Sequence, residues 1–258
     1  MLSAAHYYAG TERAYLALCP QRSGHMNMGY WPASSLQEAQ ERLITDALAH
    51  CRQRTPGLRS VIDAGSGWGG TARLLRSQLP DVRYTGVNVS AAQVQAATAR
   101  HAASAQVAYV CSDIRAHVAQ MAPADALLSV EAAFHFEDKA AWIHALRGKV
   151  RSVTLLEICI EQPRLIERAP LLRSSLGAGW SLQRYLETFR DAGFRAPEVE
   201  DVSAKTFGGF AEYLRGWDCA GYDASRAVLR QFRRAFQQVA ELARGGALRY
   251  MRLSWCAS

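Results

Sequence analysis

Short apolar runs alternate with amphipathic segments along residues 34–160. Apolar residues that recur every three or four positions are typical of a helix face, whereas a short continuous apolar run between turn residues is typical of a buried strand. On this basis we predict strands at 59–64, 82–88, 106–111, 125–131 and 152–160, and helices at 34–52, 71–79, near 91–104, shortly after 111 and at 138–148. This alternation predicts a parallel sheet with right-handed helical crossovers, an α/β fold.

Serine residues mark where three of the predicted helices begin. Ser35 opens S-x-x-E before the first helix, and Ser90 opens S-x-x-Q before the helix near 91–104. In such motifs the serine oxygen accepts a hydrogen bond from a backbone N–H of the first turn. Ser181 and Gly193 likewise predict the start and the end of a later helix over 181–193.

The pattern changes after residue 160. A strand is predicted near 198–203, then a mostly helical, aromatic-rich stretch over 206–243, and a final strand over 247–256. Ligands of parallel α/β sheets bind at the carboxyl ends of the strands. A helical insertion between two late strands is placed to cover that edge. We therefore expect a single domain over 1–258, with an N-terminal helical segment (1–55), a binding core (56–160), and late strands with a helical cap at about 206–243 (161–258).

Composition narrows the class of protein. Hydrophobic residues make up 49% of the chain and charged residues 21%, as in ordinary globular proteins. No apolar run approaches the roughly 20 residues that a membrane-spanning helix needs. The first residues lack a basic start and an apolar core, so they do not resemble a secretory signal, and a cytoplasmic location is expected. The six cysteines are scattered without C-x-x-C, which favours free thiols over disulfides or zinc ligands.

The net charge of +7 leaves three explanations open: nucleic acid, an anionic small molecule, and solubility. Nucleic-acid-binding proteins usually gather basic residues in runs or stripes. Here the arginines are spread along the chain, and no block of five or more basic residues occurs. We therefore do not expect a nucleic-acid partner.

Residues 61–70 read V-I-D-A-G-S-G-W-G-G, and Gly65, Gly67 and Gly70 fit the nucleotide-loop spacing G-x-G-x-x-G. The loop lacks the G-K-[S/T] of a phosphate-binding loop. Dinucleotide enzymes place an acid about 20 residues further on for the ribose, whereas the next strand here ends in Asn88. A nucleoside ligand without a pyrophosphate fits these residues better than NAD.

Segments along most of the chain carry a resemblance to a known family. SVIDAGSGWGGTARLL resembles motif I of class I S-adenosylmethionine-dependent methyltransferases, and YTGVNVSAAQVQAA is similar to the ribose-contacting strand end of their small-molecule branch. CSDI, SVEAAFHFEDKAAW, HMNMGYW and SLQRYLETFRDAGF resemble the adenine segment, the strand-4 motif, the entry segment and a late helix of the same branch. Asn88 replaces the usual acid, Ser66 stands where cysteine is common, and the usual P-G-G turn before strand 5 is missing.

The resemblance implies a Rossmann-like doubly wound sheet, mostly parallel with an antiparallel C-terminal strand, N-terminal helices and a helical cap insertion. It implies S-adenosyl-L-methionine as cofactor, S-adenosyl-L-homocysteine as product and no metal. The donor site would comprise the glycine loop, the two following strand ends and an N-terminal tyrosine: Asp63, Gly65, Ser66, Gly67, Asn88, Val89, Gln93, Asp113, Ile114 and Tyr8. Two alternatives stay open, since Asp113 could cap the next helix and Tyr8 could belong to a core helix.

His135 and Glu131 are the candidate catalytic residues by the same resemblance. His135 follows strand 4, where the acceptor would lie, and an imidazole titrates near neutrality. It is a candidate base, or a pocket residue that moves no proton. Glu131 could orient the donor or His135, act as the base of a carbon methylation, or be only a polar strand-end residue. Trp180, Phe207 and Trp217 could equally be cap core, but nine aromatic residues are expected at the pocket mouth: Tyr30, Trp31, Phe134, Phe136, Trp180, Phe207, Phe210, Tyr213 and Trp217.

The function that these features predict is methyl transfer to a small-molecule acceptor at oxygen, nitrogen or activated carbon, in specialised metabolism. A methyltransferase fold that binds without turnover is the alternative, and an RNA methyltransferase is a weaker one. The protein is expected to be a monomer or homodimer.

Overall fold

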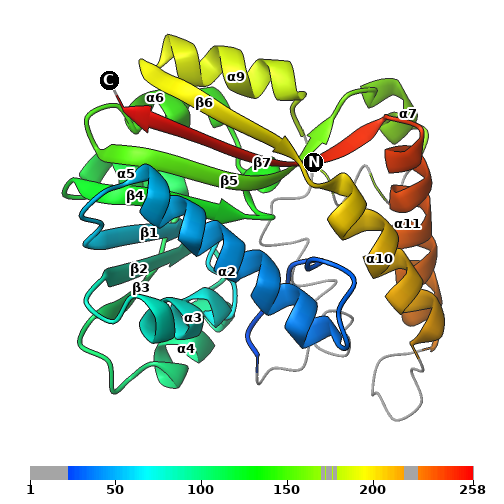
Figure 1. Ribbon diagram of the computed structural model, residues 1–258, viewed down its shortest axis with the longest axis horizontal. Coiled ribbons are helices and arrows are strands. Elements are labelled where there is room, and N and C mark those ends of the chain that lie inside the picture. The colour runs from blue at the N-terminus through cyan, green and yellow to red at the C-terminus, as the bar shows by residue number, and fades with distance from the viewer. Residues whose placement is uncertain (1–22, 170–171, 173–175, 177–178, 218–225, 258) are drawn as a thin grey trace.

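The structure is a computed structural model that describes residues 23–169, 172, 176, 179–217 and 226–257, without the side chains of 226–229. A seven-stranded sheet forms its centre, in the order β3-β2-β1-β4-β5-β7-β6 (Figure 1). The strands are β1 (Ser60–Ala64), β2 (Arg83–Asn88), β3 (Val107–Cys111), β4 (Ala124–Val130), β5 (Val150–Ile160), β6 (Phe194–Asp201) and β7 (Leu248–Ala257). The first five pair in parallel, whereas β7 runs antiparallel to both β5 and β6.

Helices cover both faces of the sheet. They are α2 (Leu36–Arg54), α3 (Gly70–Gln78), α4 (Ala91–Arg100), α5 (Ile114–Gln120), η1 (Ala133–His135), α6 (Lys139–Ala145), α7 (Pro163–Glu167), α9 (Leu182–Asp191), α10 (Ser203–Gly216) and α11 (Arg226–Arg244). One apolar core lies between the sheet and α2 and α3 and continues under α10 and α11. A second core fills the other face beneath α5, α6 and α9. The predicted doubly wound sheet with an antiparallel last strand is confirmed.

The predicted helix starts are confirmed atom by atom. The hydroxyls of Ser35, Ser90 and Ser181 each accept a hydrogen bond from the backbone N–H three residues on. Each bond satisfies a backbone donor that has no partner inside its own helix.

Several predicted boundaries are wrong. The helix near 91–104 ends at Arg100, the stretch 206–243 is two helices, and α7 was not foreseen. Strand β6 begins at Phe194 rather than near 198. It is the edge strand beyond β7 and most of its residues are exposed, so its sequence lacks the apolar alternation that reveals a half-buried strand.

Other expectations concern what the chain lacks. In the part that the structure describes, no helix is long and apolar enough to cross a membrane, and no group of His, Cys, Asp and Glu could hold a metal ion. Cys51, Cys111, Cys159 and Cys256 are free thiols. The part of the expected N-terminal helical segment before residue 23, which includes Tyr8, lies outside the described residues, as do Cys19 and Cys219.

Candidate donor and acceptor site

The glycine loop between β1 and α3 is held in a conformation that only glycine adopts readily. Gly65, Gly67 and Gly69 have φ of 87°, 52° and 83°. The backbone N–H groups of Gly65 and Ser66 both donate to the Val87 carbonyl, which fixes the loop against the end of β2. A Cβ on Gly65 would lie 2.2 Å from the Cβ of Ala132. The loop therefore touches the turn after β4, and any side chain at Gly65 would force the two apart.

Asp63 supports the loop from below. Its side chain is buried and accepts a hydrogen bond from the Tyr84 hydroxyl at 2.6 Å. Burial raises the pKa of Asp63 to about 6, although the hydrogen bonds from Tyr84 and Thr71 act in the opposite direction and lower it. A carboxylate in this position holds the loop in shape and lies behind the glycines, as the resemblance implies.

The strand ends beside the loop carry the other residues that the resemblance assigns to the donor. Asn88 donates from its amide to the Gln93 side chain at 2.7 Å. Val89 is 39% exposed, which is unusual for a large apolar residue in this chain. The Asp113 side chain is 42% exposed and accepts from the backbone N–H of Arg115, so it does cap α5. Ile114, by contrast, is buried in the core.

S-adenosylmethionine has an amino-acid end, a ribose and an adenine, and the residues present fit all three. The Ser66 hydroxyl is buried at the loop and has no hydrogen-bond partner within the described chain. Among the residues that the structure describes, a Cβ on Gly67 would have only the Met26 sulfur nearby, at 3.7 Å. An unpartnered buried hydroxyl costs free energy unless a polar ligand group meets it. The exposed apolar surface of Val89 suits an adenine ring.

Residues 23–31, which we call the strap, contact both the end of the glycine loop and α10. At one end the Gly24 carbonyl accepts from the Gly70 backbone N–H, and the Met26 sulfur lies 3.9 Å from the Gln93 amide nitrogen. At the other end the Trp31 backbone N–H donates to the Lys205 carbonyl at the start of α10. The entry-segment resemblance pointed to this stretch, yet sequence reasoning missed Met26.

Glu131 stands at the end of β4 with a left-handed backbone, φ 50°. Its Oε1 accepts from the Met28 backbone N–H of the strap at 2.7 Å and from the Tyr250 hydroxyl at 2.8 Å. Burial raises the pKa of Glu131 to about 7, although both hydrogen bonds act in the opposite direction. This carboxyl can therefore gain or lose a proton near neutral pH. Tyr250 was not foreseen, because only the pairing of β7 with β5 brings it here.

His135 lies on η1, one short turn beyond Glu131. Burial, and then the charge of Lys139, lower the pKa of His135 to about 3. The expectation that this imidazole titrates near neutrality is therefore wrong: the loss of water around the ring disfavours its charged form. At neutral pH His135 is an uncharged hydrogen-bonding group.

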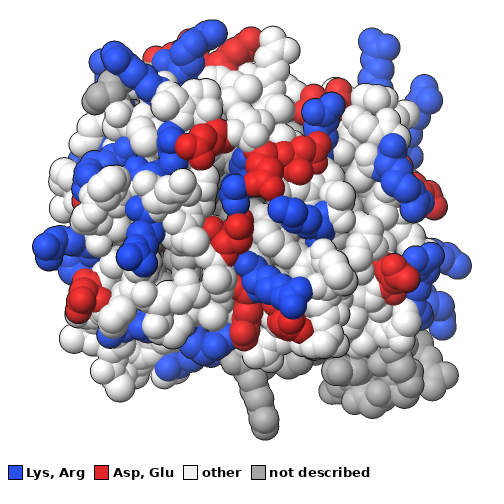
Figure 2. Space-filling view, viewed as in Figure 1, with Lys and Arg blue, Asp and Glu red and all other residues white. Residues whose placement is uncertain are grey.

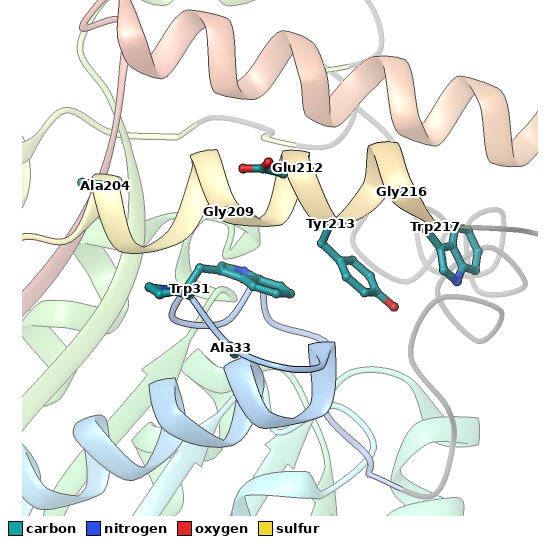
Figure 3. A pocket seen from close by; sticks show the side chains of 9 residues that line it. Trp31, Ala33, Ala204, Gly209, Glu212, Tyr213, Gly216 and Trp217 are labelled. Carbon is teal, nitrogen blue, oxygen red and sulfur yellow. The ribbon is translucent and has the colours of Figure 1, made fainter.

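A groove of about 710 Å³ opens between the strap and α10 (Figure 3). Tyr213 extends from α10 beside Trp31, and the two rings stack with centroids 5.4 Å apart. Three aromatic side chains and mostly small residues line it: Trp31, Pro32, Ala33, Ala204, Gly209, Glu212, Tyr213, Gly216 and Trp217. Three of the nine predicted acceptor aromatics, Trp31, Tyr213 and Trp217, thus face one groove.

The other six predicted aromatics do not line this groove. Tyr30 donates to Asp46, Phe210 packs edge-on against Phe236, and Phe207 packs edge-on against Tyr250. Phe134 and Trp180 are buried, and the Trp180 ring carries the Arg184 guanidinium 4.2 Å from its centroid. Phe136 has an edge 3.9 Å from the Cβ position of Gly65, so it lies beside the glycine loop instead.

A family model described as a methyltransferase domain matches residues 61–154, from β1 into β5. No curated protein matches the sequence. Among solved structures, phosphoethanolamine N-methyltransferase 2 of Haemonchus contortus is 16% identical with a TM-score of 0.79 over the whole chain, which spans 60% of that protein. The cyclopropane synthase MmaA2 from Mycobacterium tuberculosis is 18% identical with a TM-score of 0.77, covering 98% of this chain and 96% of its own. Geranyl diphosphate C-methyltransferase from Streptomyces coelicolor A3(2) is 16% identical with a TM-score of 0.73 over both whole chains.

At these identities the solved structures show the fold alone, which this chain shares with them. The family model places a methyltransferase domain on the part of the chain from β1 into β5, which carries the glycine loop and the strand ends beside it.

Proposed function

We propose that this enzyme transfers a methyl group from S-adenosylmethionine to a small-molecule acceptor of specialised metabolism. The observation that carries the proposal is the contact between the donor loop and the strand-4 turn at Gly65 and Ala132. This contact supports a donor site that lies beside Glu131 and His135. Methyl transfer is an in-line displacement, so an enzyme accelerates it chiefly by holding donor and acceptor in line and close together.

The cofactor supplies an electrophilic methyl group on a sulfonium. In the proposal, Ser66 and the loop backbone hold its amino-acid end, Asn88 and Gln93 its ribose, and Val89 and Asp113 its adenine. Glu131 is the better candidate for proton removal, because its carboxyl titrates near neutrality. His135 would orient the acceptor as an uncharged imidazole.

We infer that the acceptor has a flat or unsaturated part that lies against Trp31, Tyr213 and Trp217. Aromatic walls bind such groups through apolar contact and stacking. The strap connects this groove to the reacting centre, since the Trp31 ring nitrogen donates to the Met28 carbonyl and the Met28 N–H donates to Glu131. Oxygen, nitrogen and activated carbon all remain possible acceptor atoms.

A small molecule is favoured over nucleic acid by the surface charge. Figure 2 shows acidic and basic side chains interspersed over the face that carries α2. Arg252 pairs there with Asp46 and Glu200, and Glu200 also pairs with Lys205. Basic residues that are already paired with carboxylates offer little attraction to phosphates. We propose a single-domain cytoplasmic enzyme, monomeric or homodimeric.

Thermal unfolding with S-adenosylhomocysteine tests the donor site. The ligand should raise the melting temperature of the wild type, because it binds only the folded state. Gly67→Arg should abolish the rise by filling the space above the loop. Gly148→Arg is the matched control, since Gly148 also has positive φ but has nothing within 4 Å of its Cβ position. The absence of any rise in the wild type would overturn the donor site.

Methyl transfer from labelled donor to a metabolite extract then tests turnover. Label in a small organic product supports the proposed activity. Binding of S-adenosylhomocysteine without label transfer to any extract or RNA would instead favour the binding-module alternative.

A further inference from the structure

Tyr250 of β7 carries a buried hydroxyl that the proposed mechanism does not use. The side chain is fully buried, and its hydroxyl donates to Oε1 of Glu131 at 2.8 Å. A buried tyrosine hydroxyl needs a hydrogen-bond partner, but a neutral backbone carbonyl would serve that need as well as a carboxylate. Its contact with the candidate base therefore raises the question of what Tyr250 does for Glu131.

Tyr250 is fixed by contacts that do not involve Glu131. Its backbone N–H donates to the Ser203 hydroxyl at 2.8 Å, and its carbonyl accepts from the Val202 N–H at 2.8 Å. Its ring packs edge-on against Phe207 of α10, with the two centroids 5.7 Å apart. The sheet and the start of the cap thus hold the hydroxyl in one place.

Glu131 is also held at both its backbone and its side chain. Its backbone is left-handed, with φ of 50°, a conformation that costs free energy in residues other than glycine. Its N–H donates to the Leu156 carbonyl of β5 at 2.8 Å, which ties the residue to the sheet. Its Oε1 accepts two hydrogen bonds, from the Tyr250 hydroxyl and from the Met28 N–H. Two donors occupy both lone pairs of that oxygen.

The second carboxyl oxygen of Glu131 stays available to a ligand. The side chain is half-buried, and its Oε2 makes no hydrogen bond with the residues that the structure describes. A proton from a ligand would therefore be taken up at Oε2 rather than at Oε1. Tyr250 cannot take that proton itself. Burial and then the charge of Glu131 raise the pKa of Tyr250 well above its usual value, so its hydroxyl remains a donor.

Other titratable side chains of the described chain act on this pair. Glu157 of β5 lies close enough to Glu131 for their charges to oppose each other, and Tyr30 of the strap acts in the same sense on Tyr250. His135 on η1 is uncharged near neutral pH. None of these three carries a positive charge there. The two hydrogen bonds at Oε1 are therefore the interactions that favour the charged form of Glu131.

We propose that Tyr250 is a positioning residue for methyl transfer: together with the Met28 N–H it holds Oε1 of Glu131, so that Oε2 receives the proton that the acceptor loses. In that step the acceptor atom forms a bond to the methyl carbon, and the carbon–sulfur bond breaks with its electron pair left on sulfur. The products are the methylated acceptor, S-adenosylhomocysteine and a protonated carboxyl. The inference rests on the proposed role of Glu131 as the base.

Tyr250→Phe removes the hydroxyl and keeps the ring. Tyr185→Phe is the matched control, because Tyr185 is also fully buried and donates to a different carboxyl, that of Glu157. The measurement is an NMR titration of protein labelled with carbon-13 at the glutamate carboxyls, without donor or acceptor. The Glu131 signal is the one that disappears in Glu131→Gln.

The midpoint of the Glu131 signal should rise by about one pH unit in Tyr250→Phe, as expected for the loss of one hydrogen bond to a charged group. It should not rise in Tyr185→Phe. An unchanged midpoint in Tyr250→Phe, or an equal rise in Tyr185→Phe, would overturn the inference.

Turnover provides the second readout. The rise of kcat with pH should move upward by about one pH unit in Tyr250→Phe, because the carboxyl that accepts the proton is harder to ionise. Well below the wild-type midpoint kcat should therefore fall about tenfold, and it should recover at high pH, which a general loss of structure would not allow. The dissociation constant of S-adenosylhomocysteine should stay the same.

Two further outcomes separate this inference from the proposed function. A kinetic midpoint that stays in place while the carboxyl midpoint moves would show that Glu131 does not accept the proton, and would overturn the inference alone. Absence of methyl transfer by the wild type to any acceptor would overturn the proposed function instead, whatever the carboxyl titration shows.

Discussion

Burial pushes the pKa values of the two candidate catalytic residues in opposite directions. It raises that of Glu131 to about 7 and lowers that of His135 to about 3, because in both cases the charged form loses water. Sequence alone favoured His135 as the base, since free imidazole titrates near neutrality. In the structure, the group that titrates near neutral pH is the Glu131 carboxyl. This difference can be tested by measuring how kcat depends on pH.

The pH dependence of kcat should show a rise centred near pH 7. A carboxyl acts as a base only when deprotonated, so activity increases as the pH passes upward through the pKa of Glu131. Glu131→Gln should lower kcat and remove this rise. His135→Gln should lower kcat but keep the midpoint, because His135 is already uncharged above pH 6. A rise that persists in Glu131→Gln would assign the titration to another group.

At the scale of an element, the adjacent glycines Gly208 and Gly209 of α10 lie in different surroundings. A Cβ on Gly209 would lie 2.2 Å from the Cβ of Trp31, whereas one on Gly208 would meet nothing within 4 Å. Gly209 therefore allows the helix to approach the strap closely, and Gly208 only adds backbone freedom. The Cβ of Trp31 is tied to the backbone and cannot simply rotate away.

Gly209→Ala should destabilise the protein by about 1–3 kcal/mol, because the strap and α10 must separate. Gly208→Ala should stabilise it by about 0.5–1 kcal/mol through helix propensity alone. Urea unfolding measures both changes. The indole N–H resonance of Trp31 should shift in Gly209→Ala and stay in place in Gly208→Ala. Equal free energies of unfolding for the two variants would mean that the strap can move away from α10 without loss of stability.

Helix starts and turns that depend on neighbouring residues could be predicted from the sequence. Contacts between segments that lie far apart in the chain could not. The helix starts at Ser35, Ser90 and Ser181 and the glycine loop depend on neighbouring residues, so the local pattern suffices. The hydrogen bond between Tyr250 and Glu131, by contrast, exists because the sheet order brings separate segments together. Residue type also did not distinguish Phe210 in the cap core from Trp217 on the groove.

At the scale of the whole molecule, the strap contacts three parts of the candidate site. Within nine residues it contacts the donor loop at Gly70, the strand-4 end at Glu131 and the cap at Lys205. It is fixed from outside by Gln40 of α2, which is fully buried and donates to the Asn27 carbonyl at 2.8 Å. Movement of the strap would therefore alter donor and acceptor sites together.

Gln40→Met tests this coupling, because methionine fills the same space without the donor. The Asn27 carbonyl would lose a buried hydrogen bond worth about 1 kcal/mol, which corresponds to about a fivefold weaker affinity for S-adenosylhomocysteine by calorimetry. The Trp31 indole resonance should shift in the same variant, although Trp31 lies at the other end of the strap. Gln78→Met is the control, since Gln78 makes a comparable bond to Thr45 on the exposed side of α2. If Gln40→Met altered Trp31 but left the affinity unchanged, donor and acceptor sites would be independent.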